Sequence, residues 1–280
     1  MPDPHAAPMP AYHFDAADPR RLSRAMDDLA TGLSRWRLAS ALAWLDIRNR
    51  YRGSVLGPFW LTLSTGIMLI GLGLLYSALF KLQLREYLPH LAVSLVIWNA
   101  IAQMVNDATI SLTQSEGIIR QLPLPYTVHA LRCVMRNGII ALHNLPLIGL
   151  VFLACLHLPG PEALLAIPGL VIIFINAFAV ALLLGMVCAR FRDIGPIVTS
   201  VMQLAFFLTP ILWKPQLLGH WQVLLPFNPF YAVLETVRGP LVEGGGALSA
   251  WIAALIYTAL SVTVSIGFFV RFRGRVAFWV

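Results

Sequence analysis

The sequence predicts an all-α polytopic membrane protein with six transmembrane helices, and three observations support this fold class. The chain of 280 residues is 58% hydrophobic and 12% charged, whereas soluble domains are about 25% charged. It contains six apolar stretches of the roughly 20 residues that a helix needs to cross ~30 Å of hydrocarbon. Basic residues flank these stretches unevenly. The six stretches cover residues 56–80, 88–112, 138–158, 163–189, 194–213 and 249–270.

The chain begins with a polar segment, residues 1–32, which we expect to form a flexible cytoplasmic tail. Its first 30 residues are rich in Pro, Ala and Asp and contain no apolar region of the kind that a secretory signal peptide requires. We therefore expect no cleaved signal peptide.

Residues 33–52 are predicted to form an amphipathic helix in the membrane interface. On a helical wheel, Leu33, Trp36, Trp44 and Ile47 form one apolar stripe, and Leu38, Leu42 and Leu45 form a second. Arginines and Asp46 lie between the stripes, and arginine stems can snorkel while tryptophans lie at headgroup depth. Two stripes allow contact with both lipid and another protein. The alternative is a helix that serves only as a membrane anchor.

The six-helix domain, residues 53–272, contains two unusual connections. Residues 115–127 read SEGIIRQLPLPYT, which predicts a short amphipathic turn that is stopped and stiffened by Pro123 and Pro125. An ordinary connecting loop is the alternative.

Residues 213–240 are too apolar for a solvated loop and too interrupted by proline for a span. We expect one or two short re-entrant helices at the outer leaflet, where irregular backbone must be covered by protein or line a wet cavity. The alternative is an aromatic belt.

The distribution of basic residues predicts the orientation. All but four of the 20 Lys and Arg residues lie on one side of the predicted spans, and the exceptions are Lys81, Arg85, Lys214 and Arg238. The positive-inside rule then places both termini in the cytoplasm, with residues 273–280 as a second cytoplasmic tail. The net charge of +7 could indicate nucleic-acid binding. However, these arginines flank membrane spans, so we expect no nucleic-acid partner.

Catalytic motifs are missing from the sequence. There is no HExxH and no GxSxG, and the only lysines, Lys81 and Lys214, lie outside any Walker A context. We therefore expect no catalytic residue, no metal and no cofactor on this chain, and ATP with Mg²⁺ would be bound by a partner. The isolated acidic residues and scattered histidines argue against a membrane enzyme. Cys133, Cys155 and Cys188 are interpreted as buried small hydrophobes.

Polar residues within spans are costly in lipid and are the remaining functional candidates. Gln103, Asn106 and Asp107 lie within about one turn of the second span, so they should face protein or water. Glu235 and Arg238 are three residues apart, a spacing that allows an ion pair on one helix face.

Residues 46–63, DIRNRYRGSVLGPFWLTL, resemble the start of the first span in ABC-2 type permeases, particularly those that export polysaccharides such as O-antigen, capsule and teichoic acid. Three further stretches are similar to that family: SEGIIRQLPLP after the second span, RFRD between spans four and five, and Asn228-Pro229 followed by Glu235 and Arg238. The resemblance covers roughly residues 35–270 and implies the ABC-2, or type V exporter, fold.

The resemblance also implies partners. Two copies of the chain would form a homodimer in the bacterial inner membrane, surrounded by lipid, and bind two cytoplasmic ABC ATPase subunits. The helix at 33–52 and the elbow at 115–127 would dock on the ATPases, and the outer re-entrant helices would cover the exit of a lipid-linked glycan. The docking candidates are Trp36, Trp44, Arg48, Arg50, Arg52, Glu116 and Arg120, and the re-entrant candidates are Asn228, Pro229, Glu235 and Arg238.

A path for a sliding glycan requires aromatic platforms and neutral hydrogen-bonding groups. The candidate rings are Phe59, Trp60, Tyr76, Trp98, Phe206, Phe207 and Trp213, and the candidate amides are Asn99, Gln103, Asn106 and Gln203. Two other functions stay open at this stage. One is an ABC-2 permease that exports a small amphiphile such as a drug or lipid. The other is a membrane scaffold that transports nothing, which predicts apolar contacts throughout and no wet path.

Overall fold

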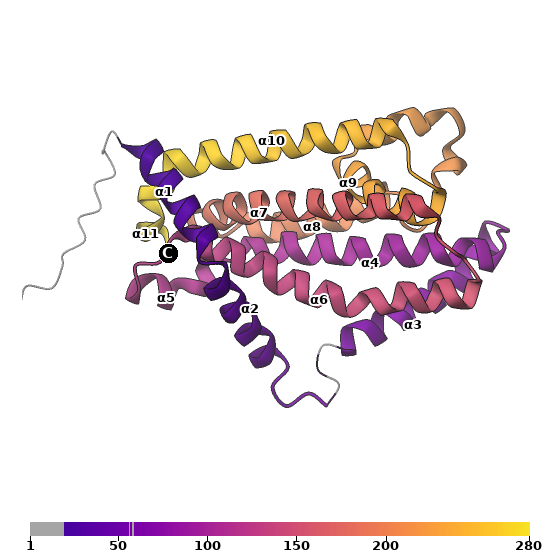
Figure 1. Cartoon of the computed structure of the whole chain (residues 1–280), viewed down its shortest axis with the longest axis horizontal. Coiled ribbons are helices and arrows are strands. Elements are labelled where there is room, and N and C mark those ends of the chain that lie inside the picture. Colours follow the sequence, from indigo (N-terminus) through magenta and orange to yellow (C-terminus); the bar gives the residue numbers. More distant parts are fainter. Residues whose placement is uncertain (1–19, 56, 58) are drawn as a thin grey trace, which may run out of the picture.

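The computed structural model describes residues 20–55, 57 and 59–280, and every regular element in these ranges is helical. Long helices run side by side along the long axis of the molecule (Figure 1). Five helical segments of the described chain are long and apolar enough to cross a membrane, which confirms the predicted fold class. The long helices are α3 (Phe59–Leu79), α4 (Leu84–Thr109), α6 (Tyr126–Cys155), α7 (Ala166–Arg190) and α10 (Leu248–Phe272).

The sixth predicted span is shorter than expected. Helix α8 (Ile194–Leu208) has 15 residues, which at 1.5 Å per residue gives about 22 Å, less than the hydrocarbon thickness. It ends before Thr209-Pro210, because proline lacks an N–H and disfavours helical backbone at the preceding residue. The following residues to Leu212 are buried. Packed irregular chain therefore occupies the end of the stretch that was predicted to be helical up to residue 213.

Helix α4 is the centre of the bundle. It contacts α3, α6, α7, α8 and α9, and the continuous segment from Tyr87 to Trp98 is buried except for Leu88. Helix α9 (Pro229–Arg238) comes close to α7 at Gly169, where a Cβ atom would collide with the backbone of Thr236. Small residues commonly permit such close approach between membrane helices.

The chain before the first span is folded, which corrects the predicted extent of the tail. Helix α1 (Arg21–Ser34) buries Ala25, Asp28 and Gly32, so the segment 21–32 is not a flexible tail. The Asp28 carboxylate accepts hydrogen bonds from the backbone N–H groups of Tyr126 and Thr127 at 3.2 and 3.1 Å. It thereby satisfies free donors at the start of α6. Residues 1–19 of the predicted tail lie outside the described residues.

The predicted helix at 33–52 is divided at Arg35, and its second part is α2 (Trp36–Arg50). The buried face of α2 consists of Ala39, Ala43 and Ile47 at four-residue spacing, and α2 packs on α6. Trp36 and Trp44, from one predicted apolar stripe, are more than half exposed. Small residues let the α2 backbone approach α6 closely and leave the large side chains of α2 on the outside.

Both terminal segments meet at one end of the bundle. Helices α1, α5 (Glu116–Gln121) and α11 (Val276–Trp279) lie there together with the C-terminus (Figure 1). Val276 and Val280 are buried in a cluster with residues of α7, so the predicted tail at 273–280 is packed onto the bundle. We call this end the arginine-rich end, because the connections that carry most of the arginines reach it.

The opposite end is closed by short helices. A 3₁₀ segment, η3 (Pro215–Phe227), precedes α9, and a π-helical turn, η4 (Gly239–Glu243), follows it. Short helices therefore occupy most of residues 213–240, and their re-entrant placement at the outer leaflet stays a prediction. Helix α9 packs against α7 and α10 and thereby closes the bundle between them.

Candidate functional site

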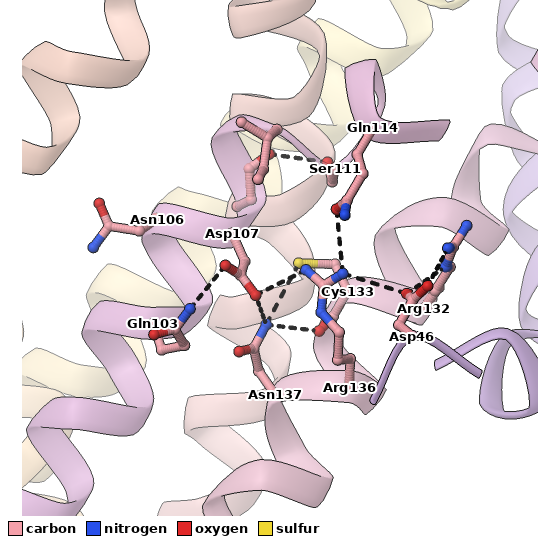
Figure 2. A network of polar contacts seen from close by, with 12 residues as sticks. Asp46, Gln103, Asn106, Asp107, Ser111, Gln114, Arg132, Cys133, Arg136 and Asn137 are labelled. Carbon is pink, nitrogen blue, oxygen red and sulfur yellow. Dashed lines mark hydrogen bonds and ion pairs between the residues drawn. The ribbon is translucent and has the colours of Figure 1, made fainter. Parts of the chain in front are cut away.

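A buried polar network joins α4 to α6 (Figure 2). Asp107 on α4 pairs with Arg136 on α6, with 2.8 Å between Arg136 Nη2 and Asp107 Oδ2. Asn137 donates to the same oxygen at 3.0 Å, and Gln103 donates to Oδ1 at 2.8 Å. Two carboxylate oxygens therefore receive three hydrogen bonds. As predicted for polar residues within a span, Gln103 and Asp107 face protein.

The same network reaches α2. Arg132 binds the carboxylate of Asp46 with two nitrogens, one of them Nε at 2.7 Å from Oδ2. Arg136 also donates to Asp46 Oδ2 and to Gln114 Oε1, each at 3.3 Å. Bidentate arginine–carboxylate pairs are strong and geometrically specific. The surface helix α2 is thus connected through α6 to the central helix α4 by charged side chains.

A polar pocket of about 340 Å³ lies beside this network, between α3, α4 and α6. Seven hydroxyl or amide side chains line it, and the charged groups of the network are not part of its lining. The polar lining residues are Ser64, Thr65, Asn99, Gln103, Asn106, Asn137 and Asn144. The pocket brings together three of the amides that the sequence indicated as path candidates, which are Asn99, Gln103 and Asn106.

Polar side chains continue from this pocket across the surface of the bundle. The hydroxyl of Thr199 on α8 donates to Asn106 Oδ1 at 2.8 Å and so joins α8 to α4. We define the polar strip as Ser64, Asn99, Gln103, Asn106, Thr199 and Gln203, all of which are partly or fully exposed. Its residues lie on α3 and α4, which are candidate membrane spans, and on the shorter apolar helix α8. Polar groups at this depth normally face protein or water rather than lipid.

The predicted aromatic residues do not form one stripe. Phe59, Trp60 and Phe207 are exposed, and Tyr76 and Trp213 are half-buried. Trp98 is only 4% exposed, with its ring centroid 5.9 Å from that of Phe206 and 5.6 Å from that of Phe230. Trp98 therefore packs against other rings inside the bundle, because α4 is surrounded by other helices at this level, and the role of Trp98 and Phe206 in a glycan path stays a prediction.

The residues predicted to dock a partner lie on α2, just after it, and on α5, which is at the arginine-rich end. Trp36, Trp44, Arg48, Arg50 and Arg52 are all exposed. On α5, Arg120 and Glu116 form an ion pair at 2.7 Å, with their side chains 65% and 44% exposed. Arg120 also donates to the backbone oxygen of Val280 at 2.8 Å, which ties α5 to the C-terminus. Their docking role stays a prediction.

At the opposite end, Asn228, Pro229, Glu235 and Arg238 each have a structural role in α9. Asn228 caps α9, because its Oδ1 accepts hydrogen bonds from the N–H groups of Phe230 and Tyr231 at 2.9 and 3.2 Å. Pro229 occupies the first helical position, which suits its fixed backbone angle. Arg238 pairs with Glu235, as their spacing predicted, and both side chains are buried. Arg238 also donates to the oxygen of Pro210 and to Ser94 Oγ.

Four residues of the buried network, Asp46, Arg132, Arg136 and Asn137, were not among the sequence-derived site residues. The sequence placed both arginines in a loop, because the third apolar stretch begins at residue 138. In the structure α6 begins at Tyr126. The signal was available in the four-residue spacing of the arginines, which places them on one helical face.

An all-helical bundle with five candidate membrane spans in its described residues and a polar strip across α3, α4 and α8 has the arrangement expected of the membrane domain of a transporter. The family of ABC-2 type transporters matches residues 37–242, and the chain belongs to this family. Among its relatives, the O-antigen export system permease protein RfbA of Klebsiella pneumoniae is 25% identical over 78% of this chain and 85% of the relative. The permease of the same name from Myxococcus xanthus is 25% identical over 80% of this chain and 90% of its own length.

Proposed function

We propose that this chain is the permease subunit of an ABC exporter that moves a lipid-linked polysaccharide, of the O-antigen class, across the bacterial inner membrane. The polar strip is the observation that supports this function most directly. It combines uncharged hydroxyl and amide groups on three helices of an ABC-2 fold, and such groups suit the many hydroxyls of a glycan. The names of the relatives support the same substrate class. A scaffold that transports nothing has no need for such a strip.

A second copy of the chain completes the path in this proposal. In one chain, the strip residues of α3 and α8 are exposed at a depth where lipid would otherwise contact them. A homodimer formed around the strip would convert it into the wall of a hydrated passage. Exposed apolar residues on the same helices, such as Ile67 and Phe207, would then contact the second copy or the surrounding lipid.

The arginine-rich end faces the cytoplasm in this proposal, in agreement with the positive-inside rule. The exposed α2 and α5 surfaces then meet two ATPase subunits, which bind ATP and Mg²⁺. A movement imposed on α2 would act on Asp46, and the paired arginines connect Asp46 to Asp107 beside the polar pocket. This connection supplies a physical route from the motor to the path.

Deletion of the gene in the native organism tests the proposal. We expect the surface polysaccharide to disappear and lipid-linked glycan to accumulate on the cytoplasmic side, and the intact gene should restore export. Normal display of polysaccharide in the deletion strain would refute the substrate class. Loss of resistance to a drug in that strain, with display unchanged, would favour the small-amphiphile exporter.

A further inference from the structure

The polar pocket between α3, α4 and α6 has the properties of a built ligand site. Its volume of about 340 Å³ lies in the range of about 300–1,000 Å³ that small-molecule sites occupy. The pocket is nearer to the arginine-rich end of α4, since Gln103 and Asn106 lie within two turns of the C-terminus of that helix. Glycan arriving from that end would meet it early.

A buried amide oxygen in the pocket wall lacks a partner. Asn137 is 1% exposed, and its Oδ1 accepts no hydrogen bond from any residue that the structure describes. Its nitrogen is held by Asp107 and by the backbone oxygen of Cys133, both at 3.0 Å. Figure 2 shows the oxygen pointing away from these partners. A buried polar atom without a partner costs about 1–3 kcal/mol, and a donor on a bound ligand would remove that cost.

Other pocket groups offer both donors and acceptors. The amide of Asn99 has no hydrogen-bond partner within the described chain. Gln103 donates to Asp107 through its nitrogen, so its oxygen remains available. Asn144 accepts from Thr62 through its oxygen, so its nitrogen remains available. A hydroxyl both donates and accepts, so a ring that carries several hydroxyls matches this mixture. An acceptor-only ligand would leave Asn137 Oδ1 and Gln103 Oε1 unpaired.

The charges near the pocket are already neutralised. Arg136 is the cation nearest to Asn137 in sequence, and it is bound by Asp107 and Asp46. No charged side chain among the described residues lines the pocket. A pyrophosphate would enter without a cation to compensate its charge, and burial of an unpaired charge is costly. The pocket chemistry therefore selects an uncharged group.

We propose that this pocket binds one uncharged sugar ring of the glycan, with Asn99, Asn137 and Asn144 as its hydrogen-bonding residues, before the chain crosses the membrane. The inference rests on the proposed function and extends it to a specific subsite. Asp107 acts as a positioning residue, because it fixes the amides of Gln103 and Asn137. The coupling route from α2 thus ends on the residues that hold the sugar.

The first test measures how lipid-linked glycan stimulates ATP hydrolysis by the permease with its ATPase in nanodiscs. The probe is the glycan that accumulates in cells lacking this chain. Asn99→Leu removes a side chain that has no internal hydrogen bond, so the fold is preserved. We expect the half-maximal glycan concentration to rise about 2- to 12-fold, the equivalent of one hydrogen bond. Asn99→Gln retains an amide and should recover part of the loss.

Thr263→Val is the matched control, because Thr263 is exposed on α10 and its hydroxyl bonds only within its own helix, to the oxygen of Ala259. It should leave the half-maximal concentration unchanged. A wild-type value for Asn99→Leu, with glycan stimulation intact, would overturn the subsite while leaving the proposed export function in place.

A second measurement does not depend on export. In an Asn99→Cys variant, a small thiol reagent labels position 99, while native Cys133, Cys155 and Cys188 are buried. Dodecyl maltoside, which has an uncharged sugar head, should slow the labelling. A phosphocholine detergent of the same chain length should not. Equal labelling rates in the two detergents would overturn the subsite. Protection by the maltoside in a chain that proves not to export polysaccharide would instead refute only the proposed function.

Discussion

Removal of one partner from the buried Glu235–Arg238 pair should destabilise the protein strongly. Arg238 is fully buried and Glu235 is 2% exposed, so neither charge can be hydrated when its partner is lost. Breaking such a pair costs about 3–5 kcal/mol. Arg238→Met also leaves the Pro210 oxygen without its donor, so this variant belongs at the upper end of the range. At about 2–4 °C per kcal/mol, the melting temperature should fall by about 6–20 °C.

The double variant Glu235→Leu/Arg238→Met removes both charges and so allows the interaction energy between the two side chains to be measured. Replacement of both charges by apolar side chains of similar size is often neutral or stabilising. The double variant should therefore be more stable than either single variant, and the cycle should give a coupling energy of at least about 3 kcal/mol. The assay is equilibrium unfolding of the detergent-solubilised protein. The exposed Glu116–Arg120 pair on α5 provides the control, with an expected coupling of about 0–1 kcal/mol. Additive single effects at Glu235 and Arg238 would refute the reasoning.

The remaining predictions concern coupling and the glycan path. Asp46→Asn should lower the amount of glycan exported per ATP hydrolysed, because a neutral amide cannot hold Arg132 and Arg136 together. This ratio is measured in proteoliposomes, and Asp27→Asn, at an exposed position, is the control. An unchanged ratio in Asp46→Asn would argue against the route from α2 to the pocket. Glu116→Lys or Arg120→Glu should uncouple hydrolysis from export while the dimer stays intact, as measured by size-exclusion chromatography and the same ratio. Because each single reversal also breaks the internal pair, the charge-swapped double variant should remain uncoupled if α5 docks on the ATPase; normal coupling in the single variants would count against docking. Trp60→Ala should slow export with little change in stability, since Trp60 is exposed. Trp98→Ala should instead lower the free energy of unfolding by about 3–5 kcal/mol. An export defect without destabilisation in Trp98→Ala would indicate that the Trp98 ring contacts the glycan.

Much of the fold follows from local sequence properties. Apolar stretches long enough to span lipid must become helices, because each backbone group then finds its partner within the same segment. The short helices near residues 213–240 follow from the prolines in that segment, and the Glu235–Arg238 pair follows from helical spacing. Local rules were less successful at helix ends. The start of α6 at Tyr126 precedes the apolar stretch, since tertiary pairing with Asp46 and Asp107 permits arginines inside that helix.

The sequence by itself determined that this chain is a multi-pass membrane protein, how its basic residues are distributed along it, and which polar residues fall within spans. Only the tertiary structure decided which of those residues meet. Asp46 and Arg132 are 86 positions apart, and no helical or strand period relates them. Trp98 was assigned to the path from its type alone, but its burial depends on the helices around α4. Hydropathy and residue spacing determine the structure within one segment. Side-chain burial, the buried ion pairs and the unpaired polar atoms of the pocket depend on contacts between segments that are distant in sequence.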